Sequence, residues 1–150
     1  MGTTIRDLYE SVSRAHEQLP SEVERIIERL SDKIIELNTE RQMFEGVDNE
    51  GKDLGVYKPL TEELSQGISG KGYPKRAGDP FNTYATGELW KSIDILFNNG
   101  NLRFFTNKPN HPFLQKKNAK DLLGLTKDNQ YELNYELLKP RILEWLHKTI

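Results

Sequence analysis

Apolar residues recur every three or four positions along the first 45 residues, which is the spacing of one face of an α-helix. The first stripe begins beside Thr4 and Asp7, which have the spacing of a capping box. It comprises Ile5, Leu8, Tyr9, Val12, Ala15 and Leu19. Because proline lacks the N–H that a helix interior needs, Pro20 is predicted to end this first helix.

A second apolar stripe follows Pro20, with Ser21 and Glu24 as a second capping-box pair. The stripe comprises Val23, Ile27, Leu30, Ile34, Leu37 and Phe44. This spacing predicts a second amphipathic helix of roughly six turns. The apolar stripe of this helix is suited to packing against another helix, from the same chain or from a neighbouring subunit.

Glycine and proline then replace the helical pattern. Eight of the 11 glycines and three of the seven prolines lie between Gly46 and Gly87, so we expect residues 46–83 to form a loop and an extended arm. The part from Ser65 to Asn82 is expected to be mobile in the isolated protein and to become ordered against a neighbour, because it holds too few apolar residues to offset its backbone entropy. The residues of this arm that are candidates for partner contact are Lys71, Tyr73, Lys75, Arg76 and Phe81.

The stretch from Tyr84 to Phe105 has the most organised local pattern in the chain. Thr86 is a candidate N-cap for a short helix that places Leu89, Trp90 and Ile93 on one face, and Trp90 is predicted to be a buried anchor. An alternating apolar pattern starts at Ile93 and continues on both sides of an Asn-Asn-Gly-Asn corner. This pattern predicts a β-hairpin over residues 93–106 that is entered from a helical turn.

Residues 131–150 fit two patterns. Tyr131, Leu133 and Tyr135 alternate as in a strand, but a helical seam also continues through Pro140. We favour a C-terminal helix that is kinked or restarted at Pro140, where proline suits a first helical turn.

Together these elements predict a single α+β domain over residues 1–150. It comprises two N-terminal helices within residues 1–45, a long Gly-rich arm over 46–83, and a small antiparallel β-sheet followed by a C-terminal helix within 84–150.

Composition and charge narrow the classes of function. Only 35% of the residues are hydrophobic and 29% are charged, so the core is modest for a chain of 150 residues. The net charge of −2 gives no general attraction to nucleic acid or to membranes. Residues 1–45 carry six Lys or Arg against ten Asp or Glu, whereas residues 81–127 carry seven against three. This asymmetry fits either solvated faces or complementary surfaces between neighbouring subunits.

No motif for catalysis or cofactor binding is complete. The chain has no cysteine, which excludes disulfides, thiolate zinc sites and cysteine nucleophiles. The loop at Asp48 departs from the EF-hand spacing, and Gly70-Lys71 lacks the rest of a phosphate-binding loop. No apolar run approaches the ~20 residues of a membrane span. We therefore expect no enzyme activity, no cofactor, no metal site and no membrane segment. The basic residues around Tyr73 leave nucleic-acid binding as an alternative.

Three motifs carry a resemblance to a known family. "TGELWKSI" (Thr86–Ile93), running into a strand, resembles the Thr-Gly-x-Leu-x-x-Ser-Ile signature of tailed-phage virion morphogenesis proteins, the small tail-completion and head–tail joining proteins. "LLGLTKDNQ" (Leu122–Gln130), followed by a terminal helix, is similar to the ending common in that group. "FEGVDNEGKDLGVY" (Phe44–Tyr57) resembles small structural proteins encoded by phages of gut Bacteroidetes-type hosts.

This resemblance implies a non-enzymatic bacteriophage structural protein at the head–tail connection. Such a protein is assembled in the host cytoplasm and acts in the virion. It forms a homo-oligomer, such as a ring, that packs against portal or tail components. The family-motif residues that the resemblance assigns to packing are Thr86, Gly87, Leu89, Trp90, Ser92 and Ile93. The alternative is a small nucleic-acid-associated packaging accessory protein that uses the basic Gly-rich arm.

Overall fold

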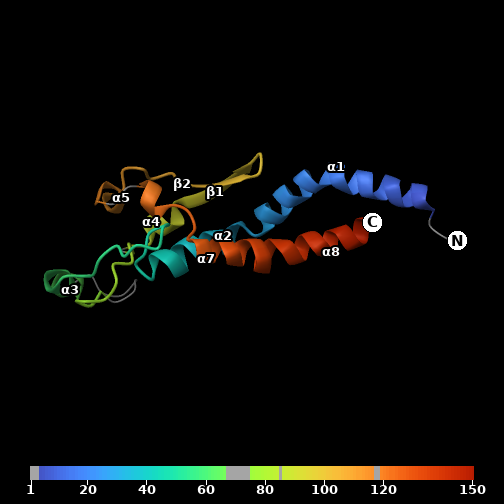
Figure 1. Cartoon of the computed structure of the whole chain (residues 1–150). Helices are drawn as coiled ribbons and strands as arrows, with labels where there is room; N and C mark the ends of the chain where they lie inside the picture. Colours follow the sequence, from blue (N-terminus) through green and yellow to red (C-terminus); the bar gives the residue numbers. More distant parts are fainter. Residues whose placement is uncertain (1–3, 67–74, 85, 117–118) are drawn as a thin grey trace.

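The computed structural model describes residues 4–66, 75–84, 86–116 and 119–150. The chain is α+β, as predicted, with helices and a two-stranded antiparallel sheet. The molecule is elongated (Figure 1). One end consists of the long helix α1 (Ile5–Arg29) with α8 (Lys139–Thr149) alongside it, and the other end holds the hairpin and the short helices.

Helix α1 begins with the predicted capping box. The Thr4 hydroxyl accepts a hydrogen bond from the Asp7 N–H at 3.1 Å, and the Asp7 carboxylate accepts from the Thr4 N–H at 2.9 Å. The predicted break at Pro20 is wrong, and so is the second start at Ser21, because α1 continues through both residues to Arg29. An interior proline costs about 3 kcal/mol. Pro20 itself is exposed, and burial of Ala15 and Ile26 on the two sides of it favours an uninterrupted helix.

The helical path changes at Leu30 instead. This residue has φ −97° and ψ 3°, outside the α-helical region, and its N–H is shared among carbonyls of the preceding turn. Helix α2 (Ser31–Glu36) follows and leads directly into a π-helix, η1 (Leu37–Met43). The predicted second helix of six turns is therefore the end of α1 together with α2 and η1.

Acidification should fray the first turn of α1. Hydrogen bonds from the side chain and the backbone of Thr4 lower the pKa of Asp7 below its ordinary value of 3.8. A lowered pKa contributes stability that is complete above the ordinary value and is lost as the pH falls through the folded-state value. We expect the Thr4 and Asp7 amide signals in NMR spectra to move toward random-coil positions below about pH 3.8, and to do so before global unfolding. The control is an Asp7→Asn variant, which has no titratable carboxylate and whose first turn should be frayed at every pH. A wild-type cap that stays intact in acid would contradict this account.

The predicted hairpin is present. Helix α4 (Glu88–Lys91) leads into β1 (Ile93–Asn98), which pairs with β2 (Asn101–Thr106). Asn99 and Gly100 form the corner, with φ values of 49° and 77°. Positive φ at both central residues is the mark of the type I′ turn, for which Asn-Gly is a preferred sequence.

The C-terminal part is helical throughout, which excludes the strand interpretation of residues 131–137. Helix α7 (Lys127–Tyr131) continues into a second π-helix, η2 (Glu132–Leu138), and then into α8. Pro140 lies in the first turn of α8, as predicted, but the helix does not restart there, because Leu138 and Lys139 keep right-handed helical dihedrals. Helix α8 runs beside α1, and the C-terminus lies beside the middle of α1 (Figure 1). The first turns of α1 therefore project beyond its partner helix.

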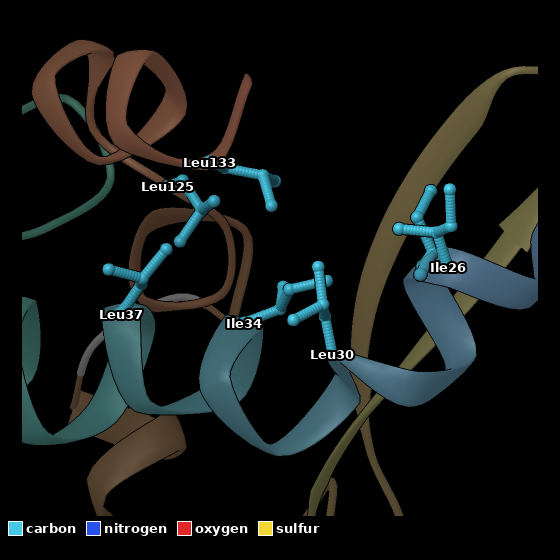
Figure 2. Packing of buried hydrophobic residues seen from close by; sticks show 7 residues of the cluster. Ile26, Leu30, Ile34, Leu37, Leu125 and Leu133 are labelled. Atoms are coloured by element: carbon cyan, nitrogen blue, oxygen red, sulfur yellow. The ribbon is translucent and has the colours of Figure 1, made fainter. Parts of the chain in front are cut away.

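Two hydrophobic clusters form the core. The first joins the end of α1, α2 and η1 to the C-terminal helices, and Figure 2 shows Leu30, Ile34 and Leu37 pointing toward Leu125 and Leu133. Its buried members are Ile26, Ile27, Leu30, Ile34, Leu37, Leu125 and Leu133.

The second cluster lies under α4 and the hairpin. Its buried members are Met43, Leu54, Leu89, Trp90, Ile93, Leu114 and Leu122. Leu114 comes from α5 (Pro112–Lys116) and Leu122 from α6 (Ala119–Leu122). A further short helix, α3 (Pro59–Gln66), lies at the end of the molecule opposite to α1 (Figure 1).

Candidate functional site

The family-motif residues begin at a tight entry to α4. Thr86, predicted as the N-cap, is not the cap: Gly87 holds that position, with φ 82° and no side-chain cap. The Thr86 hydroxyl accepts only a long bond, 3.4 Å, from the Glu88 N–H. A Cβ on residue 87 would lie 2.9 Å from the Tyr84 hydroxyl oxygen. Gly87 is therefore required by both its positive φ and its close approach to Tyr84.

The apolar residues of the motif are buried, as predicted. Leu89 is 2% exposed, Trp90 8% and Ile93 4%. The Trp90 indole N–H donates to the Thr83 hydroxyl at 3.2 Å, and the Tyr84 ring meets the indole edge-on with 4.9 Å between centroids. Trp90 is therefore a buried anchor of α4.

Ser92 joins the motif to the sheet. Its hydroxyl donates to the Leu89 carbonyl at 2.6 Å and lies 2.6 Å from the Thr106 hydroxyl at the end of β2. The buried motif residues Leu89, Trp90, Ser92 and Ile93 thus pack α4 against the hairpin, whereas Thr86 is exposed. They form a packing unit rather than a binding site.

The arm residues are only partly described. Lys71 and Tyr73 lie outside the described residues. Lys75 is partly buried, its Nζ lies 5.8 Å from the centre of the Tyr57 ring, and burial lowers its pKa. Arg76 is exposed. Phe81 packs edge-on against Tyr57 and Phe113, with ring centroids 5.4 and 5.3 Å away.

The prediction that the arm becomes ordered only against a neighbour is wrong for residues 75–82. Backbone hydrogen bonds tie this segment to residues 55–57, including the Phe81 N–H to the Gly55 carbonyl at 2.8 Å and the Tyr57 N–H to the Asp79 carbonyl at 3.0 Å. The Tyr57 hydroxyl also donates to the buried Asn82 side chain at 2.6 Å, and burial raises the pKa of Tyr57. Phe81 therefore finds its pocket within its own chain.

Sequence reasoning missed a buried polar network around η1. Asn38 donates to the Leu122 and Gly124 carbonyls at 2.9 and 2.7 Å, and Gln42 accepts from the Thr126 N–H at 2.8 Å. Asn129 donates to the Leu37 carbonyl at 2.9 Å. In a sequence, buried Asn and Gln residues of this kind cannot be told from surface residues. The one feature of the sequence that pointed to this region was the family-like ending over Leu122–Gln130. The network holds that ending against the π-helix.

An open hollow of 870 Å³ lies beside this network. Its charged lining residues have both signs and comprise Arg41, Glu45, Glu50, Lys127 and Asp128. Within the described parts of the chain, no group of three or more His, Asp or Glu residues could hold a metal ion. No helix among the described residues is long and apolar enough to cross a membrane.

The projecting part of α1 carries an exposed apolar stripe. Exposed fractions are 88% for Ile5, 48% for Leu8, 71% for Tyr9 and 46% for Val12. Helix α8 has no fully buried residue, and its Leu143 is 44% exposed. We define the exposed stripe of α1 by Ile5, Leu8, Tyr9 and Val12, and regard it as the candidate interaction surface.

Comparisons of the chain with protein-family models, with curated proteins and with solved structures found no match.

Proposed function

We propose that this chain is a non-enzymatic structural protein of a tailed-phage particle, placed at the head–tail connection. It acts there by packing against further copies of itself and against portal or tail proteins. The exposed stripe of α1 is the observation that carries the proposal. The resemblance of Thr86–Ile93 and Leu122–Gln130 to virion morphogenesis proteins supplies the biological setting.

The exposed stripe favours an assembly over a monomer. Burying one large aliphatic or aromatic side chain contributes about 1.5–3 kcal/mol, and the stripe offers four such residues. They lie at the free end of a long helix, where α8 no longer covers α1 (Figure 1). A helix from a neighbouring subunit can therefore reach them without rearrangement of either core.

Charge favours contact between α1 of one copy and α8 of another. Helix α1 carries six acidic and four basic residues, whereas α8 carries three basic residues and one acidic residue. The two helices already lie side by side within one chain. The same opposite charges suit an intermolecular pairing, which supports the homo-oligomer part of the proposal.

Removing the exposed stripe should abolish self-association. We expect the wild-type protein to exceed the monomer mass in light scattering, and an Ile5→Ser, Leu8→Ser, Val12→Ser variant to be monomeric, because little apolar area then remains to bury. The control is an Arg14→Ser, Glu17→Ser, Glu24→Ser variant, which makes three changes at exposed polar positions of the same helix. Equal masses for the two variants would contradict a role of the stripe.

The virion setting is tested by co-expression with the portal and tail proteins of the same phage. We expect co-purification with at least one of them and incorporation into particles. A protein that stays monomeric and binds no particle component overturns the proposal. Binding to DNA instead, with steep dependence on salt, would favour the packaging accessory function.

A further inference from the structure

The outer edge of β2 presents unpaired backbone groups. Asn98 and Asn101 flank a two-residue turn, so they form a pair that exchanges both backbone hydrogen bonds. Such pairs alternate along an antiparallel ladder, which makes Arg103 and Phe105 the other residues of β2 that are bonded to β1. The bond from the Asn107 N–H to the Ser92 carbonyl, 3.2 Å, continues the same alternation.

Leu102, Phe104 and Thr106 therefore direct their N–H and C=O groups away from β1. Within the described residues, these backbone groups have no hydrogen-bond partner. On the other side of the hairpin, β1 contacts α1 and α2. The open edge of this small sheet is thus on β2, and an open edge is a template for another strand.

A groove follows this edge. It has a volume of 480 Å³, and its lining includes every residue from Leu102 to Thr106. Because side chains alternate between the two faces of a strand, a hollow lined by five consecutive residues runs along the edge and not over one face. The opposite wall is formed by Lys120, Leu123 and Gly124.

The two faces of the groove differ in chemistry. Phe104 is partly buried and packs against both hydrophobic clusters. Leu123, on the opposite wall, is also partly buried. Arg103 is exposed on the outer face, and it makes no ion pair within the described chain. The lining holds two cationic residues, Arg103 and Lys120, and no acidic residue. A strand with apolar side chains on its inner face and acidic side chains on its outer face would complement the apolar inner side and the cationic outer side of the groove.

We propose that the outer edge of β2 is a strand-addition site for an extended segment of another protein in which apolar and acidic residues alternate. The segment pairs antiparallel with β2 and exchanges hydrogen bonds with Leu102, Phe104 and Thr106. Its apolar side chains lie beside Phe104 and Leu123, and its acidic side chains lie beside Arg103. This surface is separate from the exposed stripe of α1, so the inference stands independently of the proposed virion role.

The test uses the full chain and the peptide acetyl-Val-Glu-Val-Glu-Val-amide. We expect hydrogen exchange of the Leu102, Phe104 and Thr106 amides to slow on binding. The Arg103 and Phe105 amides, which already bond to β1, should show no change. The matched peptide with Lys in place of Glu should bind more weakly. Arg103→Glu should weaken binding of the Glu peptide by about fivefold, the loss expected for one exposed ion pair, whereas Arg141→Glu on α8 should leave it unchanged.

N-methylation separates strand pairing from simple charge attraction. Residues paired with Phe104 have side chains on the same face as Phe104, so the Val N–H groups of the peptide point at β2 and the Glu N–H groups point away. Methylation of the Val nitrogens should abolish binding, and methylation of the Glu nitrogens should not. Equal effects of the two methylations overturn the proposal. Protection of the same amides without peptide, rising with protein concentration, would assign the edge to a second copy of the chain and would also overturn it.

Discussion

Trp90→Ala should lower the free energy of unfolding by about 3–5 kcal/mol, a large part of the stability of a small domain. The side chain is 8% exposed and belongs to the core cluster under α4 and the hairpin. Its loss leaves a cavity beneath α4 and removes the partner of the Thr83 hydroxyl, which is itself buried. Chemical denaturation of the purified variant measures the effect.

Two further variants make this result specific. Trp145→Ala removes the same side chain from α8, where it is only partly buried, and should cost clearly less. Trp90→Phe keeps a smaller ring in the cavity and cannot donate to Thr83. It removes the hydrogen bond, worth about 0.5–1.5 kcal/mol, with only part of the packing, so it should cost less than Trp90→Ala. A Trp90→Ala protein with the denaturation midpoint of the wild type would show that the anchor is misplaced.

Gly46→Ala should be strongly destabilising, by about 2–5 kcal/mol, because two penalties act together. Gly46 has φ +74°, a conformation that costs an L-residue roughly 1–2 kcal/mol. An added Cβ would also lie 2.7 Å from the Pro80 Cβ and 3.2 Å from the Phe81 N. Both neighbours belong to the segment that packs on residues 55–57, so the substitution pushes that segment away from its site.

Gly51→Ala is the matched control for this substitution. Gly51 has a similar φ of +82°, but no atom lies within 4 Å of the added Cβ. Gly51→Ala should lower the free energy of unfolding only by the cost of the positive φ, about 1–2 kcal/mol. The difference between the two variants in denaturation measures the contact between Gly46 and the 80–81 segment. Equal losses would mean that this segment is not held against Gly46 in solution.

Features that depend on residues close together in the chain could be predicted from the sequence. The Thr4–Asp7 cap, the Asn99-Gly100 corner and the place of Pro140 in a first helical turn each depend on residues within one turn of one another. The burial of Trp90 also followed, because a large apolar residue on the same short face as Leu89 and Ile93 is stabilised by removal from water. Within the described residues, the alternation around the corner placed both strands correctly.

Other features were decided only by contacts between distant residues. Burial of Ala15 and Ile26 on the two sides of Pro20 favours the uninterrupted helix α1. Residues 75–82 are ordered because Tyr57 and Phe113 provide the pocket that Phe81 lacks in its own stretch of sequence.

For the two candidate surfaces, the stripe of α1 and the edge of β2, the sequence and the tertiary structure likewise decided different things. The sequence alone determined the apolar stripe from Ile5 to Val12, because helical periodicity is a property of neighbouring residues. Only the tertiary structure decided that this stripe projects beyond α8 and that the edge of β2 stays open beside Leu123. Whether a face is covered depends on where elements from other parts of the chain come to lie. That placement is fixed here by long-range hydrogen bonds, such as Asn38 to Gly124, and by the two hydrophobic clusters.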